Sequence, residues 1–285
     1  MYRNISSGIC SIFQTRDQRF YYTAFALLLV IQLCPIWFTA YPAMHDFPNH
    51  LARAQILHQY NDSESYRSIY EQDWRFFPNL AIDLIVPPLL NVVSIETAGK
   101  IFLSMMIVLF NVGLHALGFV VMGRPHWSAL TATFFAFNYT FAYGFVNYTF
   151  GLGVFFLTLA AWLRMRSDWN VGRLLLMTLL ALTCYFSHLS SFIFLGIAIG
   201  CLTGLDLVRT RALRSRDLLG LLPLVPTVVV YLFYASGIQH RNPMEWWTPI
   251  ILKKLTGFSY PFVTHNLTVE LTLSAVFAII LLILF

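Results

Sequence analysis

The sequence is poor in charged residues. Of its 285 residues, 11% are Asp, Glu, Lys or Arg, whereas 58% are hydrophobic, and the mean hydropathy is +0.67. Soluble globular domains contain about 25% charged residues. A chain with so few charges cannot cover a water-facing surface, which excludes a soluble enzyme. We therefore predict an all-α, polytopic transmembrane helical bundle.

Cysteine is scarce as well. The four cysteines are isolated, and no C-x-x-C or Cys/His spacing indicates a zinc site or a redox pair. A net charge of +5 could suggest a nucleic-acid partner, but the basic residues are dispersed through an apolar chain. We therefore expect no nucleic-acid partner, and we interpret the positions of the basic residues as a record of membrane topology.

Long apolar runs are abundant. A helix needs about 17–25 apolar residues to cross about 30 Å of hydrocarbon. The stretch 78–93 is short and carries Asp83 and the pair Pro87-Pro88, which would break a spanning helix, so we interpret it as interfacial or re-entrant. We predict about eight spans, at residues 20–40, 101–122, 127–143, 147–163, 174–190, 191–208, 217–236 and 268–285.

Basic residues divide unevenly between the two sets of connections. With 78–93 not counted as a span, eleven fall in the N-terminus and in short loops on one side, and seven fall in much longer loops on the other. The positive-inside rule then predicts a cytoplasmic N-terminus, with the long loops 41–100 and 237–267 facing outward. The last apolar run stops at Phe285 with no polar tail, so we expect 1–285 to be one transmembrane domain from the N-terminal part of a longer protein.

The first outer loop begins with YPAMHDFPNHLARAQ, in which ionisable residues follow an apolar run directly. Asp46 is a good N-cap and Pro48 suits a first turn, so a helix should begin here. Asp46, His50 and Arg53 would then share one face of that helix at the membrane surface. Asp46 could be only a cap, or also a base or a metal ligand. Asp46 and His50 are only two ligands and a metal site needs three or four, so we favour a hydrated polar face and keep a divalent cation as the alternative.

Arg53 has a second interpretation. Its guanidinium is a rigid donor fork suited to phosphate, either of lipid headgroups or of a lipid-linked substrate. Asp73 could be a second carboxylate that faces Asp46. Asp83 is costly to leave unpaired in an apolar helix.

Candidate partners for Asp83 are Arg75 and Lys100, so a structural ion pair is one interpretation and a role in a site is the other. His188 follows an apolar helix at its outer end. A histidine in such a position is usually interfacial or hydrogen-bonded, but it could also line a cavity that opens outward.

Four stretches carry a resemblance to a known family: DFPNHLARAQIL, WRFFPNLAIDLIVPPLL, YGFVNYTFGLGVFFLTLAAWLR and FSHLSSF. Over most of 20–208 the chain resembles a family of bacterial inner-membrane proteins that we associate with the GT-C class of polytopic glycosyltransferases. In that class, the first outer loop places a catalytic Asp just past the first helix and continues with juxtamembrane helices. The resemblance implies a GT-C-like bundle in the bacterial inner membrane.

The resemblance also implies a reaction: transfer of a sugar from a polyprenyl-phosphate donor to an envelope acceptor at the outer face. It gives catalytic roles to Asp46, as base, and to Asp73. Arg53, Arg75 or Lys100 would fit the role of holding the leaving phosphate. From their positions in the sequence, His50 and His188 are further candidates for substrate binding.

Two other functions stay open. The class's Asp-Glu pair is absent at Asp46, and Asn138 and Asn147 stand where a second outer turn would carry an Asp. This departure favours a non-catalytic membrane component of an envelope-polysaccharide system. A transporter of polyprenyl-linked or other anionic lipids would need ionisable groups on the spans, where His115 is the main one. The sugar, the acceptor and the oligomeric state are not fixed by the sequence.

Overall fold

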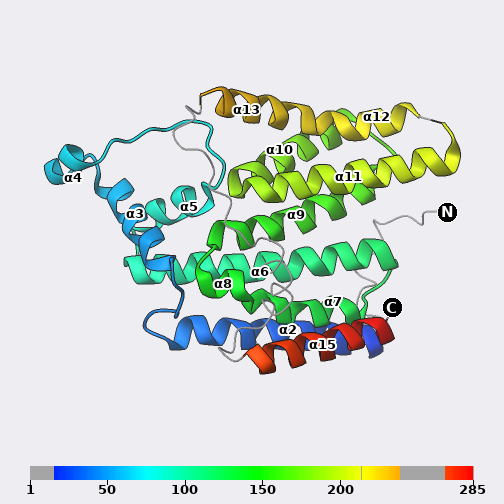
Figure 1. Ribbon diagram of the computed structural model, residues 1–285, viewed down its shortest axis with the longest axis horizontal. Coiled ribbons are helices and arrows are strands. Elements are labelled where there is room, and N and C mark those ends of the chain that lie inside the picture. The colour runs from blue at the N-terminus through cyan, green and yellow to red at the C-terminus, as the bar shows by residue number, and fades with distance from the viewer. Residues whose placement is uncertain (1–15, 213, 238–266, 285) are drawn as a thin grey trace.

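The structure is a computed structural model that describes residues 16–212, 214–237 and 267–284. Every element in these ranges is a helix, and none is a strand, which confirms the all-α class for the described chain. The long helices run side by side, and the short ones gather mainly at one end of the bundle (Figure 1). Most of the expected second outer loop lies outside the described residues.

Five stretches are long and apolar enough to cross a membrane. Four are α2 (Arg16–Phe38), α6 (Ile95–Met122), α9 (Val146–Met165) and α11 (Leu189–Thr210), and the fifth is the run of α12 (Ser215–Leu221), η2 (Leu222–Leu224) and α13 (Val225–Ser236). These helices fit a membrane protein. α10 (Val171–Ser187) is apolar but shorter, and α15 (Leu267–Leu284) is the last described helix. The count of eight spans stays a prediction.

The predicted span 127–143 is not one helix. It forms α7 (Trp127–Thr131), the 3-10 helix η1 (Ala132–Phe137) and α8 (Tyr139–Tyr143). A break in a helix leaves backbone groups that need other partners in an apolar interior.

Two amide side chains supply a partner at this break. The Nε2 of Gln32 on α2 donates to the carbonyl oxygen of Thr133 at 2.7 Å, and the Nδ2 of Asn111 on α6 donates to the Oε1 of Gln32 at 2.7 Å. All three residues are buried. The prediction of one continuous helix over 127–143 was wrong, because the sequence does not show that amides of distant helices stabilise a break in this mostly apolar stretch.

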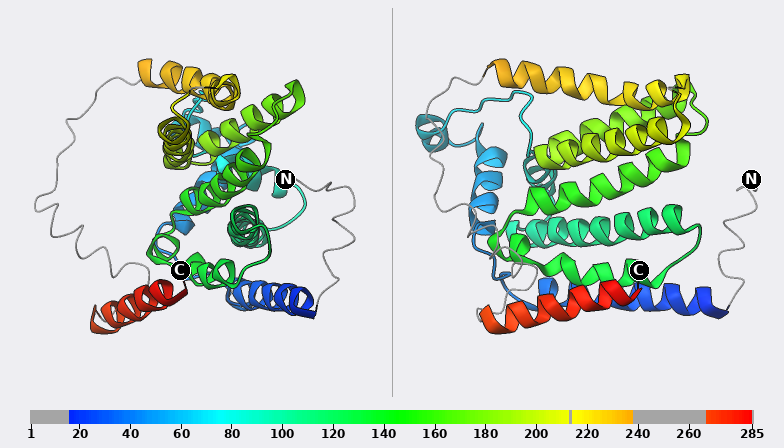
Figure 2. Two further views of the ribbon diagram at one scale, coloured as in Figure 1. Left: turned by 90° about the vertical axis from the view of Figure 1, so that its right-hand side faces the viewer. Right: turned by 45° about the vertical axis from the view of Figure 1, so that its right-hand side comes forward.

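The connections lie at two opposite ends of the bundle (Figure 1). One end holds α8, the α10–α11 junction and the three short helices of the first outer loop, α3 (Phe47–Gln59), α4 (Glu64–Ile69) and α5 (Ala81–Leu89). The other end holds the arginine-bearing connections after α6, α9 and α11. Figure 2 shows the same separation from two further directions. That the α3–α5 end faces outward stays a prediction from the charge distribution.

Helices α6 and α9 pack closely through glycines. A Cβ on Gly153 would lie 2.8 Å from backbone atoms of Leu109 and Phe110, and a Cβ on Gly113 would lie 2.6 Å from the Gly153 carbonyl oxygen. Small residues allow such approaches between helices in membranes. The α6–α9 pair therefore has no room for added volume at Gly113 and Gly153.

We expect Gly153→Ala to destabilise the protein, because the new methyl group must push α6 and α9 apart at a cost of about 1–3 kcal/mol. The measurement is the midpoint of thermal unfolding in detergent micelles. Gly200→Ala on α11 is the matched control, since its Cβ would meet open space. Better helix propensity should leave this control unchanged or stabilise it by up to about 1 kcal/mol. Equal midpoints for the two variants would contradict the close packing.

Candidate functional site

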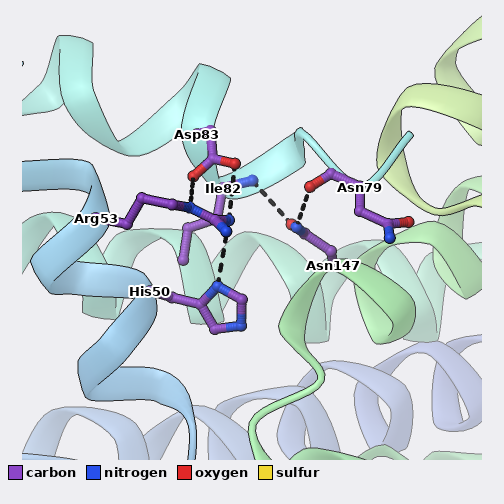
Figure 3. A network of polar contacts seen from close by, with 6 residues as sticks. All are labelled: His50, Arg53, Asn79, Ile82, Asp83 and Asn147. Carbon is purple, nitrogen blue, oxygen red and sulfur yellow. Dashed lines mark hydrogen bonds and ion pairs between the residues drawn. The ribbon is translucent and has the colours of Figure 1, made fainter. Parts of the chain in front are cut away.

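The amide of Asn147 on α9 binds the loop that carries α3, α4 and α5, which we predict to face outward, to the bundle (Figure 3). Its Oδ1 accepts a hydrogen bond from the backbone N–H of Ile82 at 2.9 Å, and its Nδ2 donates to the carbonyl oxygen of Asn79 at 2.5 Å. Leu80, the N-cap residue of α5, has no side-chain cap. The buried Asn147 therefore satisfies a backbone donor at the start of α5 that would otherwise be unpaired.

The turn at Asn79 is also bound to the α10–α11 junction. Asn79 has a positive φ of 69°, and its Oδ1 accepts from the backbone N–H of Leu189 at 3.2 Å. The N–H of Leu80 donates to the carbonyl oxygen of Phe186 at 2.7 Å. The first outer loop is thus fixed to three helices, α9, α10 and α11.

An ion pair joins α3 and α5, two of the three helices of this loop. The Nε and Nη2 of Arg53 on α3 each lie 2.8 Å from a carboxylate oxygen of Asp83 on α5 (Figure 3). The Asp83 side chain is 7% exposed and that of Arg53 is 49% exposed. The prediction that Arg75 or Lys100 pairs with Asp83 was therefore wrong. Helix α3 lies alongside α5 and brings Arg53 to the buried carboxylate.

Burial raises the pKa of the Asp83 carboxyl, and the charge and hydrogen bonds of Arg53 oppose that rise. His50 lies beside this ion pair, with its Nδ1 3.5 Å from the Nη2 of Arg53. Burial, followed by the Arg53 charge, lowers the pKa of His50, while Asp46, Asp83 and a hydrogen bond to the Gly144 backbone oppose this. A lowered pKa keeps His50 neutral at pH 7.

The start of α3 rests on the turn after α8. The backbone N–H groups of His45 and Asp46 donate to the carbonyl oxygens of Ala142 and Tyr143 at 2.9 and 3.1 Å. Gly144 has a φ of +89°, and a Cβ there would lie 2.8 Å from the Asp46 nitrogen. Only glycine fits this contact without strain, so the YG dipeptide fixes the position of Asp46.

Asp46 occupies the N-cap position of α3, as predicted, but its carboxylate makes no capping hydrogen bond. Its backbone, at φ −101° and ψ −5°, is not in the extended conformation that a capping side chain normally needs. The Oδ1 accepts instead from the Nδ2 of Asn49 at 2.8 Å. The position predicted for Asp46 was therefore correct, and the capping role of its side chain was wrong.

Asp46 lines a cavity of about 460 Å³, which we call the Asp46 cavity. Four segments of the chain meet there, and its lining residues are Asp46, His50, Asn79, Thr140, Phe145, Val146, Asn147, Tyr148 and His188. His188 separates α10 from α11, and its Nδ1 accepts from the backbone N–H of Ser190 at 3.2 Å. Burial lowers the pKa of His188, so the ring is neutral and carries its proton on Nε2.

A second cavity, of about 670 Å³, lies between α3, α5 and the segment 70–80, and we call it the Trp74 cavity. Arg53 and Asp83 are part of its wall, together with Trp74. Asn79 lines both cavities. Asp46 and His50, at the start of α3, therefore line one cavity and Arg53 lines the other. The three side chains that were predicted to share one face of the helix are divided between two cavities.

Three other predicted site residues lie apart from the Asp46 cavity. Asp73 is half exposed and pairs with Arg75 at 2.8 Å, and it lines the Trp74 cavity. The expectation that Asp73 faces Asp46 was wrong, because the turn at Asn79 directs segment 70–80 to the other side of α3. Lys100, in the second turn of α6, lines neither cavity.

A metal site has little support from the side chains that meet here. Across the described ranges, no group of three or more His, Cys, Asp or Glu residues is arranged to hold a metal ion.

The structure also adds residues that the sequence did not single out for a site, namely Asn79, Asn147 and Tyr148. The signal for Asn79 was its place after Pro78 in a turn, and that for Asn147 was a polar amide at the start of an apolar run.

No family model, no curated protein and no solved structure matches the chain. The resemblance stated from the sequence therefore stays an expectation. The interpretation of the site rests on its own geometry: two cavities at one end of a bundle of apolar helices, separated by α3 and Asn79.

We expect Arg53→Ala to destabilise the protein by about 1–2 kcal/mol at neutral pH, because it leaves the buried Asp83 without its partner. The figure is below that for a fully buried pair since the Arg53 guanidinium is half exposed. The measurement is the change in stability of the Arg53→Ala variant on thermal unfolding in detergent. Arg75→Ala removes an exposed ion pair and is the matched control, with an expected change below about 0.5 kcal/mol.

The destabilisation should depend on pH in a defined direction. A carboxyl whose pKa is higher in the folded protein binds its proton more tightly there, so its unfavourable contribution is present above the folded-state pKa and is lost as the pH falls. Removal of Arg53 raises the pKa of Asp83 further. The effect of Arg53→Ala should thus be smaller near about pH 5 than near about pH 8. A loss that grows on acidification would contradict the assignment to Asp83.

Proposed function

We propose that this protein is a membrane glycosyltransferase that moves a sugar from a polyprenyl-phosphate donor to an envelope acceptor at the outer face. One observation carries the proposal. Asp46, His50, Tyr148 and His188 come from distant parts of the chain and line one cavity at the end of the bundle where a lipid headgroup would arrive. Catalytic groups gathered in a cavity on a rigid scaffold support an enzyme.

Asp46 has the role of general base in this proposal. One carboxylate oxygen is oriented by Asn49, and the carboxylate takes the proton of the acceptor hydroxyl as that oxygen bonds to the anomeric carbon of the sugar. The bond between the anomeric carbon and the phosphate oxygen breaks, and the phosphate leaves with the electron pair. The Tyr148 hydroxyl and the Nε2–H of His188 are donors in the same cavity for the departing oxygens.

A second candidate is a non-catalytic component that binds envelope glycans. It is favoured by the ion pairs that Arg53 and Arg75 form with carboxylates. The phosphate-binding roles expected for Arg53 and Arg75 meet a difficulty, because each guanidinium is paired with a carboxylate at 2.8 Å. The transporter alternative gains nothing from His115, whose Nδ1 lies 2.7 Å from the Tyr21 hydroxyl and whose ring packs among aromatic rings of α2.

We expect Asp46→Asn to abolish the envelope glycan that depends on the protein, because the amide cannot accept the proton of the attacking hydroxyl. Loss of a general base typically lowers the rate by about 10²–10⁴-fold. The measurement is mass spectrometry of envelope glycans from cells that lack the gene and carry either the wild-type or the variant copy.

Asp62→Asn is the control, since Asp62 lies exposed in the turn after α3 and lines neither cavity. It should restore the glycan fully. Normal glycans with Asp46→Asn, at a normal level of the protein in the membrane, would refute the catalytic role and favour the non-catalytic component.

A further inference from the structure

The Trp74 cavity has walls that are tied together by hydrogen bonds. The Tyr60 hydroxyl at the end of α3 donates to the carbonyl oxygen of Tyr70 at 3.1 Å. The Tyr185 hydroxyl on α10 donates to the carbonyl oxygen of Phe76 at 2.9 Å. The first bond joins the two walls, α3 and segment 70–80, and the second attaches that segment to α10, so the cavity is a formed feature of the fold.

The charges in this cavity are unfavourable for an anion. Three carboxylates line it, those of Glu71, Asp73 and Asp83, together with a single guanidinium, that of Arg53. Asp83 already engages the Nε and Nη2 of Arg53. Among the described residues, no ion pair involves Glu71. Asp73 pairs with Arg75, which does not line the cavity, so Glu71 is the carboxylate without a paired cation in the described chain. A phosphate here would meet the negative charge of Glu71, so the cavity opposes the ligand that Arg53 was first expected to bind.

The remaining groups match a hydroxyl-rich ring. Trp74 is 56% exposed and lines the cavity beside Tyr60, Tyr70 and Phe77, so aromatic surface is available for stacking. The carboxylates accept hydrogen bonds, and the Nη1 of Arg53, which makes no hydrogen bond to the described residues, can donate them. A sugar hydroxyl both donates and accepts, and apolar walls with a few polar groups are typical of small-molecule sites.

We propose that the Trp74 cavity binds a neutral sugar ring and discriminates against phosphate. The inference rests on the proposed function only for the idea that sugars are the substrates, because the charges and aromatic surface belong to the cavity alone. The Trp74 cavity would then hold a sugar while the Asp46 cavity, on the other side of α3, holds the reacting groups. Asn79, which lines both cavities, would lie between them.

The test is saturation-transfer NMR on the full chain in lipid nanodiscs, which avoids detergents with sugar headgroups. The probes are glucose, galactose, mannose and N-acetylglucosamine, with glucose 1-phosphate and inorganic phosphate as anionic comparators. At least one neutral sugar should bind, and Trp74→Ala should weaken it about tenfold or more. Phe76→Ala is the matched control, since Phe76 is 60% exposed, lies two residues away and does not line the cavity.

Glu71→Gln keeps the side-chain volume and removes one negative charge. It should lower sugar binding a few-fold and improve the binding of glucose 1-phosphate. The proposal is overturned if no neutral sugar binds, if Trp74→Ala and Phe76→Ala behave alike, or if glucose 1-phosphate binds the wild-type protein better than glucose does.

A polyprenyl-phosphate-linked sugar in the same nanodiscs identifies the source of the ring. Because the donor sugar is bonded to a phosphate, competition with the free monosaccharide would contradict the discrimination against phosphate, and the absence of competition assigns the cavity to the acceptor glycan. The assay needs no turnover, so Asp46→Asn protein should bind the monosaccharide like wild type. If Asp46→Asn leaves cellular glycans normal while Trp74→Ala still removes sugar binding, the transferase proposal fails and this inference stands.

Discussion

The requirement that buried backbone groups find hydrogen-bond partners controls this structure. Where a helix breaks or begins inside the apolar bundle, an amide side chain from another helix meets the freed group. Gln32 does so for Thr133, and Asn147 does so for Ile82 and Asn79. An unpaired amide group in a dry interior costs several kcal/mol, so these few contacts determine where the chain can be irregular.

Asn147 has the wider consequences of the two. Because it fixes the start of α5, it also fixes Asp83, and Asp83 holds Arg53 across the gap to α3. The position of α3 in turn sets His50 and Asp46 against the turn at Gly144. A loop that reads as a long connection is therefore a rigid part of the bundle's end, with a cavity on each side of α3.

The two cavities differ in the chemistry that they offer. The Asp46 cavity brings one carboxylate together with two imidazoles that burial keeps neutral, which suits proton transfer. The Trp74 cavity has an excess of carboxylates and exposed aromatic surface, which suits a polar but uncharged ligand. Arg53 and Arg75 at this end are each paired with a carboxylate, so neither guanidinium is left as an uncompensated positive charge for a phosphate.

The sequence by itself determined the helical fold, the presence of helices apolar and long enough to cross a membrane, the start of a helix after Asp46 and a short helix within 78–93, which is α5 (Ala81–Leu89), because each depends on local composition or on proline and turn chemistry. It could not determine that Asp83 pairs with Arg53, that Asp73 faces away from Asp46, or that 127–143 is broken. Those outcomes depend on which segments lie side by side after folding. Arg53 and Asp83 are thirty positions apart in the sequence, and their charges meet only because α3 packs against α5. The tertiary structure therefore decides which ion pair forms.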